Sequence, residues 1–161
     1  MPVAAFSRSP AADPWRGYVA TRGRQVLAAL GLRRRELSLA IVDDAEMRTL
    51  NRTYRRRNAP TDVLAFALDE SDPALVMPRL PHAPLGDVVI SIETAARQAR
   101  TSRCALAARI DALLIHGILH LVGYDHERSP AEARRMARRA REVRAALPTL
   151  AAPARPGRKG R

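Results

Sequence analysis

Apolar residues recur along the chain with two different periods, which distinguish helices from strands. Asp13 and Pro14 are typical of an N-cap and a first helical residue, and Gly31 is typical of a helix end. Between them runs an apolar stripe with helical spacing, formed by Trp15, Val19, Val26 and Leu30. We therefore predict an amphipathic helix between Asp13 and Gly31.

Strands are predicted where apolar residues alternate with small or polar ones or form short runs. Residues 37–41, 61–68 and 86–92 have this character, and we expect a short edge strand near residues 3–6. Residues 69–85 contain four prolines and His82. This composition indicates a surface loop, with His82 exposed and not bound to a metal.

Further helices are predicted between and after the strands. Asp43 and Glu46 resemble a capping box at the start of one helix. Its predicted buried face consists of Met47, Leu50 and Tyr54. Its end carries Arg52, Arg55, Arg56 and Arg57, most of which we attribute to the favourable placement of cations near a helix C-terminus. Residues 93–101 and 106–122 form a short and a long helix.

The last predicted helix begins with Ser129 as N-cap and Pro130 as first helical residue, and Pro148 ends it. Its apolar face consists of Ala133, Met136, Ala137, Ala140, Val143 and Leu147, and its basic face of Arg134, Arg138 and Arg141. That basic face either binds RNA or is simply solvated. Residues 148–161 are rich in Pro, Ala, Gly and Arg, so we expect a single domain over residues 1–147 and a basic, disordered tail.

Three of the four histidines lie within residues 116–126. His116 and His120 are four residues apart on the long helix, so their rings lie on one face, one turn apart. Gly123 suits the αL residue that ends a helix, and the turn lets His126 swing toward the same point. Three neutral imidazoles that converge in this way form an open tetrahedral zinc site, whose fourth position is left for water or substrate.

The pattern H-x-x-x-H-x-x-G-x-x-H has the spacing of the metzincin proteases, but Gly117 occupies the place of their general-base glutamate. One alternative is that these are buried, hydrogen-bonded core histidines. The stronger alternative is a structural zinc site, which usually has four protein ligands. No fourth ligand is obvious, because Cys104 is one long helix away and is assigned to packing, and Asp125 fits better as a partner that orients a ligand.

Composition narrows the class of partner. A chain of 161 residues with 47% hydrophobic content favours one globular domain. A net charge of +12 favours a polyanion, with RNA or DNA first and an anionic membrane second. An arginine-rich genome is the alternative, because only one of the 28 basic residues is lysine.

The single cysteine excludes an internal disulfide and suits a reducing cytoplasm. The first residues lack the apolar core of a signal peptide, and no run of about 18 apolar residues exists. We therefore expect a cytoplasmic protein without a transmembrane helix or a membrane partner.

Three segments together resemble one known family. They are LNRTYRRRNAPTDVLAF (residues 50–66), LGDVVIS (residues 85–91) and HGILHLVGYDH (residues 116–126). In this order and spacing they are similar to the YbeY family of bacterial rRNA-maturation endoribonucleases. The resemblance spans residues 37–126 and implies an α+β, zincin-like domain, with a small mixed β-sheet and about five helices packed around it.

The resemblance also implies a function. It implies a zinc-dependent endoribonuclease, with one zinc ion per chain, that cleaves single-stranded RNA. Such an enzyme acts in 3′ maturation of 16S rRNA, ribosome assembly and quality control, with rRNA, the small ribosomal subunit and ribosomal proteins as partners. The family's metal ligands carry over onto His116, His120 and His126, and its functionally important arginine onto Arg55. The family often has serine where Ala65 stands, so any role of a hydroxyl is absent here.

An RNA substrate tolerates Gly117 better than a peptide does, because the 2′-hydroxyl or the phosphate of RNA can take part in the proton transfers. Arg55 is a candidate phosphate clamp. Asp125 or Glu127 is a candidate for orienting a ligand or water, and the alternative for Asp125 is to cap the turn. Two other functions remain open: a metalloprotease-like hydrolase with another base, and a non-catalytic ribosome-assembly factor with a structural zinc.

Overall fold

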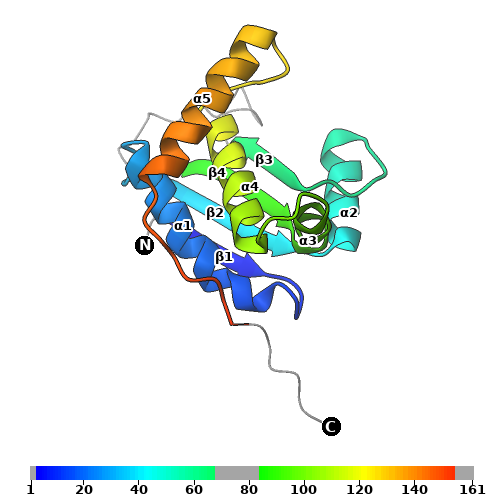
Figure 1. The fold of residues 1–161 in the computed structure, drawn as a ribbon. Helices are drawn as coiled ribbons and strands as arrows, with labels where there is room; N and C mark the ends of the chain where they lie inside the picture. Colours follow the sequence, from blue (N-terminus) through cyan, green and yellow to red (C-terminus); the bar gives the residue numbers. More distant parts are fainter. Residues whose placement is uncertain (1–2, 68–83, 155–161) are drawn as a thin grey trace.

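A four-stranded mixed sheet forms the centre of the computed structural model, which describes residues 3–67 and 84–154 (Figure 1). The strands are β1 (Val3–Ser7), β2 (Glu36–Val42), β3 (Val63–Ala67) and β4 (Pro84–Ser91), in the order β1-β2-β4-β3. The first three strands in this order are parallel, and β3 pairs antiparallel with β4 at the sheet edge. All four predicted strands are confirmed.

The prediction of residues 69–85 as a loop is wrong at its end, because Pro84 and Leu85 belong to β4. Pro84 begins the strand, a position where a missing backbone N–H is tolerated. The rest of that predicted loop, including His82, lies outside the described residues.

Five α-helices accompany the sheet in the described part of the chain. They are α1 (Arg16–Ala29), α2 (Asp44–Arg55), α3 (Ile92–Thr101), α4 (Leu106–Leu121) and α5 (Pro130–Ala146), with a short 3-10 helix (Asp13–Trp15) before α1. The predicted α+β class is therefore confirmed. Among these helices none is long and apolar enough to cross a membrane alone; α3 and α4 together reach the length and composition, but the two are bent by 118°.

The N-caps predicted from the sequence are confirmed at two helices and wrong at a third. The side chains of Asp43 and Ser129 accept hydrogen bonds from the backbone N–H groups of Glu46 and Glu132, as N-caps do. Asp13, in contrast, lies inside the 3-10 helix, and Ala12 is its N-cap. The Asp13 carboxylate instead accepts a hydrogen bond from the Ser7 hydroxyl at 2.6 Å, which fastens this turn to β1.

Helices cover the two faces of the sheet unequally. Alternating residues of β2, such as Leu37, Leu39 and Ile41, are buried in the main core with α1 and α4, and α5 packs on the outer side of α4 (Figure 1). On the opposite face, Met47 of α2 is the centre of a smaller cluster. That cluster also contains Val42, Leu64 and Val89. Helix α2 covers only part of this face.

Three side chains are more exposed than the sequence predicts. Tyr54 was assigned to the buried face of α2, but it is 61% exposed because it lies beyond the apolar cluster that Met47 anchors. Cys104 lies in the turn between α3 and α4 and is exposed, so its assignment to packing is wrong. Ala137 on α5 is exposed as well.

A buried ion pair joins α1 to α4. Arg22 donates from Nε and Nη2 to the two oxygens of Asp111 at 3.1 and 3.2 Å, and the Tyr18 hydroxyl donates to the same carboxylate at 2.8 Å. Arg22 also donates to the Pro148 carbonyl, and Leu150 packs against the main core. The first residues of the predicted tail are therefore attached to the domain; residues 155–161 lie outside the described part.

Candidate functional site

Helix α4 places two histidines on one side of the core. Nine of its sixteen residues are buried, so the helix is held firmly between the sheet and α5. His116 and His120 lie one turn apart on it and are partly exposed. Gly123 has a φ of +105°, and the backbone N–H of Tyr124 donates to the carbonyl of Leu119 at 3.1 Å. The predicted glycine turn after the helix is confirmed.

That turn brings His126 back to the helix. The ring centroids of His116 and His126 are 5.1 Å apart, and all three histidines line one cavity of about 450 Å³. In the part of the chain that the structure describes, however, no three His, Cys, Asp or Glu side chains are arranged to hold a metal ion. The three histidines thus line one cavity, but within the described residues they are not arranged as a three-ligand metal site.

The chemistry of these donors fits a divalent cation. Burial, followed by the proximity of His126 and His120, lowers the pKa of His116, so its imidazole stays neutral, which is the form that binds a metal. His120 Nδ1 is buried and has no hydrogen-bond partner among the described residues. A buried polar atom without a partner is unfavourable, and a bound ligand in this cavity is one way to satisfy it.

The cavity wall opposite α4 is formed by the free edge of β3 and the end of α2. Arg55 Nη2 donates to the carbonyl of Ala65 at 2.9 Å, and its guanidinium lies over the ring of Phe66, 5.2 Å from the centroid. Asn51 supports the end of the helix, because its side chain donates to the Ala59 carbonyl at 2.8 Å. Arg55 therefore reaches the cavity while it occupies an edge-strand carbonyl that would otherwise lack a partner.

Arg57 also lines this cavity, although no sequence pattern singled it out. It was assigned with its neighbours to helix-end electrostatics. Helix α2 stops because Arg56 adopts a left-handed conformation with a φ of 58°. The chain then turns toward the histidines. The run of three arginines before Asn58 was the only available signal, and it does not say which of them points inward.

Asp125 and Glu127 both line the cavity. The Asp125 carboxylate accepts a hydrogen bond from the backbone N–H of Glu127 at 2.9 Å, and its other oxygen lies 3.5 Å from Arg128 Nε. The turn-capping alternative for Asp125 is thus present in the structure. The orientation of a ligand or water by Asp125 or Glu127 stays a prediction.

Gly117 lines the same cavity, and packing explains why it has no side chain. A Cβ atom at this position would lie 2.7 Å from Cγ1 and 3.2 Å from Cγ2 of Val88 on β4. Val88 is buried and its branched side chain is stiff at χ1, so it cannot easily move aside. The close approach of α4 to the sheet therefore excludes a glutamate at this position without a shift of the helix.

A second cavity, of about 360 Å³, also includes His116 in its lining. Arg141 and Arg144 of α5 line it, together with Asp62 and Arg109. Asp62 accepts hydrogen bonds from Gln98 at 3.1 Å and Arg109 at 3.3 Å, which joins the start of β3 to α3 and α4. The sequence offered no pattern for this network, because its members are far apart in the chain.

The comparisons with known proteins agree with this architecture. The family model described as "Endoribonuclease YbeY" matches residues 18–148. That range includes both arginine-bearing α2 and the three histidines. The chain belongs to the YbeY endoribonuclease family.

Relatives named "Endoribonuclease YbeY" include one from Anaeromyxobacter sp. strain Fw109-5, 51% identical over 76% of this chain and 60% of its own length. Another, from Geobacter metallireducens, is 45% identical over 87% of this chain and 89% of its own length. This chain thus spans less than two thirds of the first relative. The solution structure of TM1509 from Thermotoga maritima, with a TM-score of 0.54 and 21% identity over 89% of both chains, supports the fold.

Proposed function

We propose that this chain is a zinc-dependent endoribonuclease, specific for single strands, whose reaction takes place in the histidine cavity. Within this proposal it acts in the cytoplasm on 16S rRNA, in 3′ maturation, ribosome assembly and quality control, with the small ribosomal subunit and its proteins as partners. The observation that carries the proposal is the shared cavity of His116, His120 and His126, beside Arg55, in a member of the YbeY family.

His116, His120 and His126 are the residues that would hold one zinc ion per chain. A zinc ion bound by three neutral imidazoles supplies Lewis-acid chemistry and lowers the pKa of a water molecule toward 7. The unpartnered Nδ1 of His120 and the lowered pKa of His116 support this assignment.

The remaining residues bind and orient the RNA. Arg55 and Arg57 place two cations on the α2 side of the cavity, where they attract a phosphodiester and stabilise the charge on its oxygens during cleavage. Asp125 and Glu127 supply carboxylates on the opposite side, suited to orient water or a histidine ring. Gly117 supplies no base, so the substrate's own 2′-hydroxyl or phosphate takes part in the proton transfers.

The test is metal content together with cleavage of a labelled single-stranded RNA, measured for the wild type and for His120→Ala. We expect about one zinc ion per wild-type chain, cleavage that chelation removes, and loss of both properties in the variant. Arg55→Ala should retain zinc but cleave more slowly. A folded wild-type protein that binds no zinc, or that cleaves RNA equally well after chelation, would contradict the proposal.

Two alternatives give different results in the same assays. A metalloprotease-like hydrolase digests casein and leaves RNA intact, and the clash at Gly117 argues against it because the protease glutamate does not fit there. If the chain is a non-catalytic assembly factor with a structural zinc, the wild-type protein cleaves no RNA. In that case the His120→Ala variant also loses its fold. Circular dichroism of the variant separates this outcome from loss of catalysis.

A further inference from the structure

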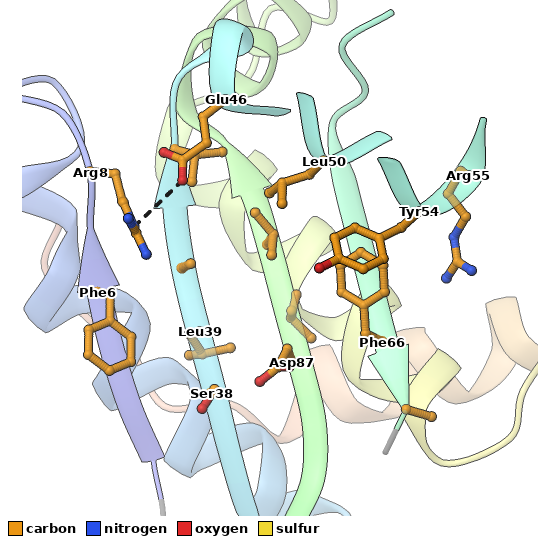
Figure 2. Close-up of a pocket in the computed structure, with 15 residues that line it drawn as sticks. Phe6, Arg8, Ser38, Leu39, Glu46, Leu50, Tyr54, Arg55, Phe66 and Asp87 are labelled. Atoms are coloured by element: carbon orange, nitrogen blue, oxygen red, sulfur yellow. Dashed lines mark ion pairs between the residues drawn. The ribbon is translucent and has the colours of Figure 1, made fainter. Parts of the chain in front are cut away.

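The sheet face opposite α1 and α4 has an open groove beside α2. Helix α2 covers Val42, Leu64 and Val89, but the sheet continues beyond it. A cavity of about 600 Å³ lies there, and Figure 2 shows side chains of all four strands and of α2 around it. The function proposed above uses one residue of this groove, Arg55, and leaves the others without a role.

Two exposed aromatic residues line this groove. Phe6 on β1 is 55% exposed and Tyr54 on α2 is 61% exposed, and they are the large hydrophobic residues that stand exposed within the described residues. Tyr54 is not isolated, because its ring centroid lies 5.2 Å from that of Phe66 on β3. Scattered exposed apolar residues need no explanation, but their gathering in one groove marks a binding surface.

The floor between the aromatic residues is mostly apolar, with Ala40 and Val89 among its residues, but it carries two polar side chains. Ser38 on β2 pairs in register with Asp87 on β4, and Asp87 pairs with Phe66 on β3, so the three lie in one row across the sheet. Phe6 lies in the next row, because it pairs with Ala40. Asp87 is exposed and Ser38 is half-buried. A carboxylate and a hydroxyl at this place are suited to accept hydrogen bonds from the amino groups of nucleic-acid bases.

Arginines stand at both ends of the groove. At one end Arg8 lies 3.6 Å from Glu46, and because the Arg8 side chain is 64% exposed this ion pair is weak and free to exchange for a phosphate (Figure 2). At the other end, Arg55 lines both this groove and the histidine cavity. The two cavities therefore share Arg55, which places the open groove next to the histidine cavity.

We propose that this groove binds the single-stranded RNA next to the cleavage site, with bases stacked on Phe6 and Tyr54 and phosphates at Arg8 and Arg55. The proposal rests on the proposed function, because it gives the substrate of that site a second contact surface. Aromatic residues on an open four-stranded sheet stack bases in other RNA-binding proteins, and the net charge of +12 favours a polyanion.

A protein partner or a second copy of the chain fits the groove less well. The core of a protein interface is depleted of charged residues. This groove contains four of them: Arg8, Glu46, Arg55 and Asp87. The same mixture suits a nucleic-acid strand, because the rings can stack on base faces, the acceptors can bind amino groups on base edges, and the cations can bind phosphates.

The experiment measures the affinity of the full chain for a fluorescein-labelled 12-nucleotide RNA by anisotropy, in EDTA, with the integrity of the RNA checked on a gel. Phe6→Ala and Tyr54→Ala should each weaken binding roughly 5- to 150-fold, the range expected for loss of one stacked base. Phe6→Leu keeps the apolar bulk and should weaken binding similarly, whereas Phe6→Tyr keeps the ring and should bind as the wild type does.

Salt dependence separates stacking from charge. Arg8→Ala should reduce the slope of log affinity against log salt concentration by about 0.7, as for one phosphate contact on a single strand, while Phe6→Ala should leave the slope unchanged. Wild-type affinity in both alanine variants of the aromatic residues would overturn the proposal. Wild-type affinity in Phe6→Leu would also overturn it. A change of oligomeric state in sedimentation, as the sole effect of Phe6→Ala, would overturn it as well.

The proposed function and the groove fail in different assays. Wild-type protein that binds RNA through Phe6 and Tyr54 but cleaves none of it in zinc overturns the proposed reaction and supports the groove. If the wild-type protein cleaves RNA but its RNA affinity is unchanged in Phe6→Ala and Tyr54→Ala, the proposed reaction is supported and the proposed role of the groove is overturned.

Discussion

Removal of Asp111 should destabilise the protein more than any exposed substitution, because it leaves a buried cation without a counter-ion. Arg22 and Asp111 are only 7% and 9% exposed, and their two hydrogen bonds close a fork-shaped pair between α1 and α4. The Tyr18 hydroxyl is a third donor to the same carboxylate. In Asp111→Ala, three donors lose their acceptor while Arg22 remains charged.

The magnitude follows from the asymmetry of buried ion pairs. Loss of one partner of a buried pair costs about 3–5 kcal/mol, whereas replacement of the whole pair by apolar residues is often neutral. Against a typical total of about 5–15 kcal/mol, the single substitution takes a large share of the free energy of unfolding. Asp111→Asn should come close to the same loss, because it keeps an acceptor for Tyr18 but leaves the charge of Arg22 uncompensated.

The assay is urea denaturation at pH 7, followed by circular dichroism, for the wild type, Asp111→Ala and a triple variant with Tyr18→Phe, Arg22→Met and Asp111→Leu. The triple variant should lie within about 1–2 kcal/mol of the wild type, because no donor or acceptor remains at the three buried side-chain positions. Gln25 and the carbonyl of exposed Pro148 lose Arg22 as a donor, which accounts for the remaining difference. The reasoning is refuted if Asp111→Ala loses less than about 1 kcal/mol, since the pair would then be effectively solvated.

Three smaller predictions test other parts of the structure. Gly117→Ala should lower the free energy of unfolding by about 1–2 kcal/mol, because overpacking against Val88 outweighs the gain in helix propensity; an increase in stability would contradict the contact. Burial disfavours the charge of Asp44, but hydrogen bonds from Arg97, Thr94 and Ser91 outweigh it and lower its pKa. The ionised Asp44 carboxylate therefore stabilises the fold, fully above the unfolded pKa of about 3.9, and this contribution is lost as the pH falls through the lower folded pKa. Asp44→Asn should be less stable than the wild type at pH 7 and should lose less free energy of unfolding on acidification to pH 3. Urea denaturation at each pH measures both differences. Gly123→Val should destabilise the turn after α4, because a β-branched residue does not adopt a φ of +105°, and thermal melting that matches the wild type would refute this.

The patterns of the chain determined the local structure of this protein. Hydrophobic spacing placed the four strands and five helices, and the i, i+4 spacing of His116 and His120 with Gly123 determined that a helix and turn carry the histidines. These features follow from dihedral preferences and from periodicity within a few residues, which act before any distant contact forms. Tyr54 shows the limit of this reasoning. Periodicity marked its side of α2 as apolar, yet Tyr54 lies beside Phe66 at the open groove and stays 61% exposed.

Only the tertiary structure decided which distant residues meet. The sheet order places antiparallel β3 at the edge, and this arrangement brings Arg55 to the boundary of the histidine cavity and the open groove. The same packing sets Arg22 against Asp111, 89 residues away, and holds α4 so close to Val88 that any side chain at residue 117 requires a shift of its neighbours. Such contacts depend on how whole elements bury their apolar faces against each other, and no short stretch of sequence contains that information.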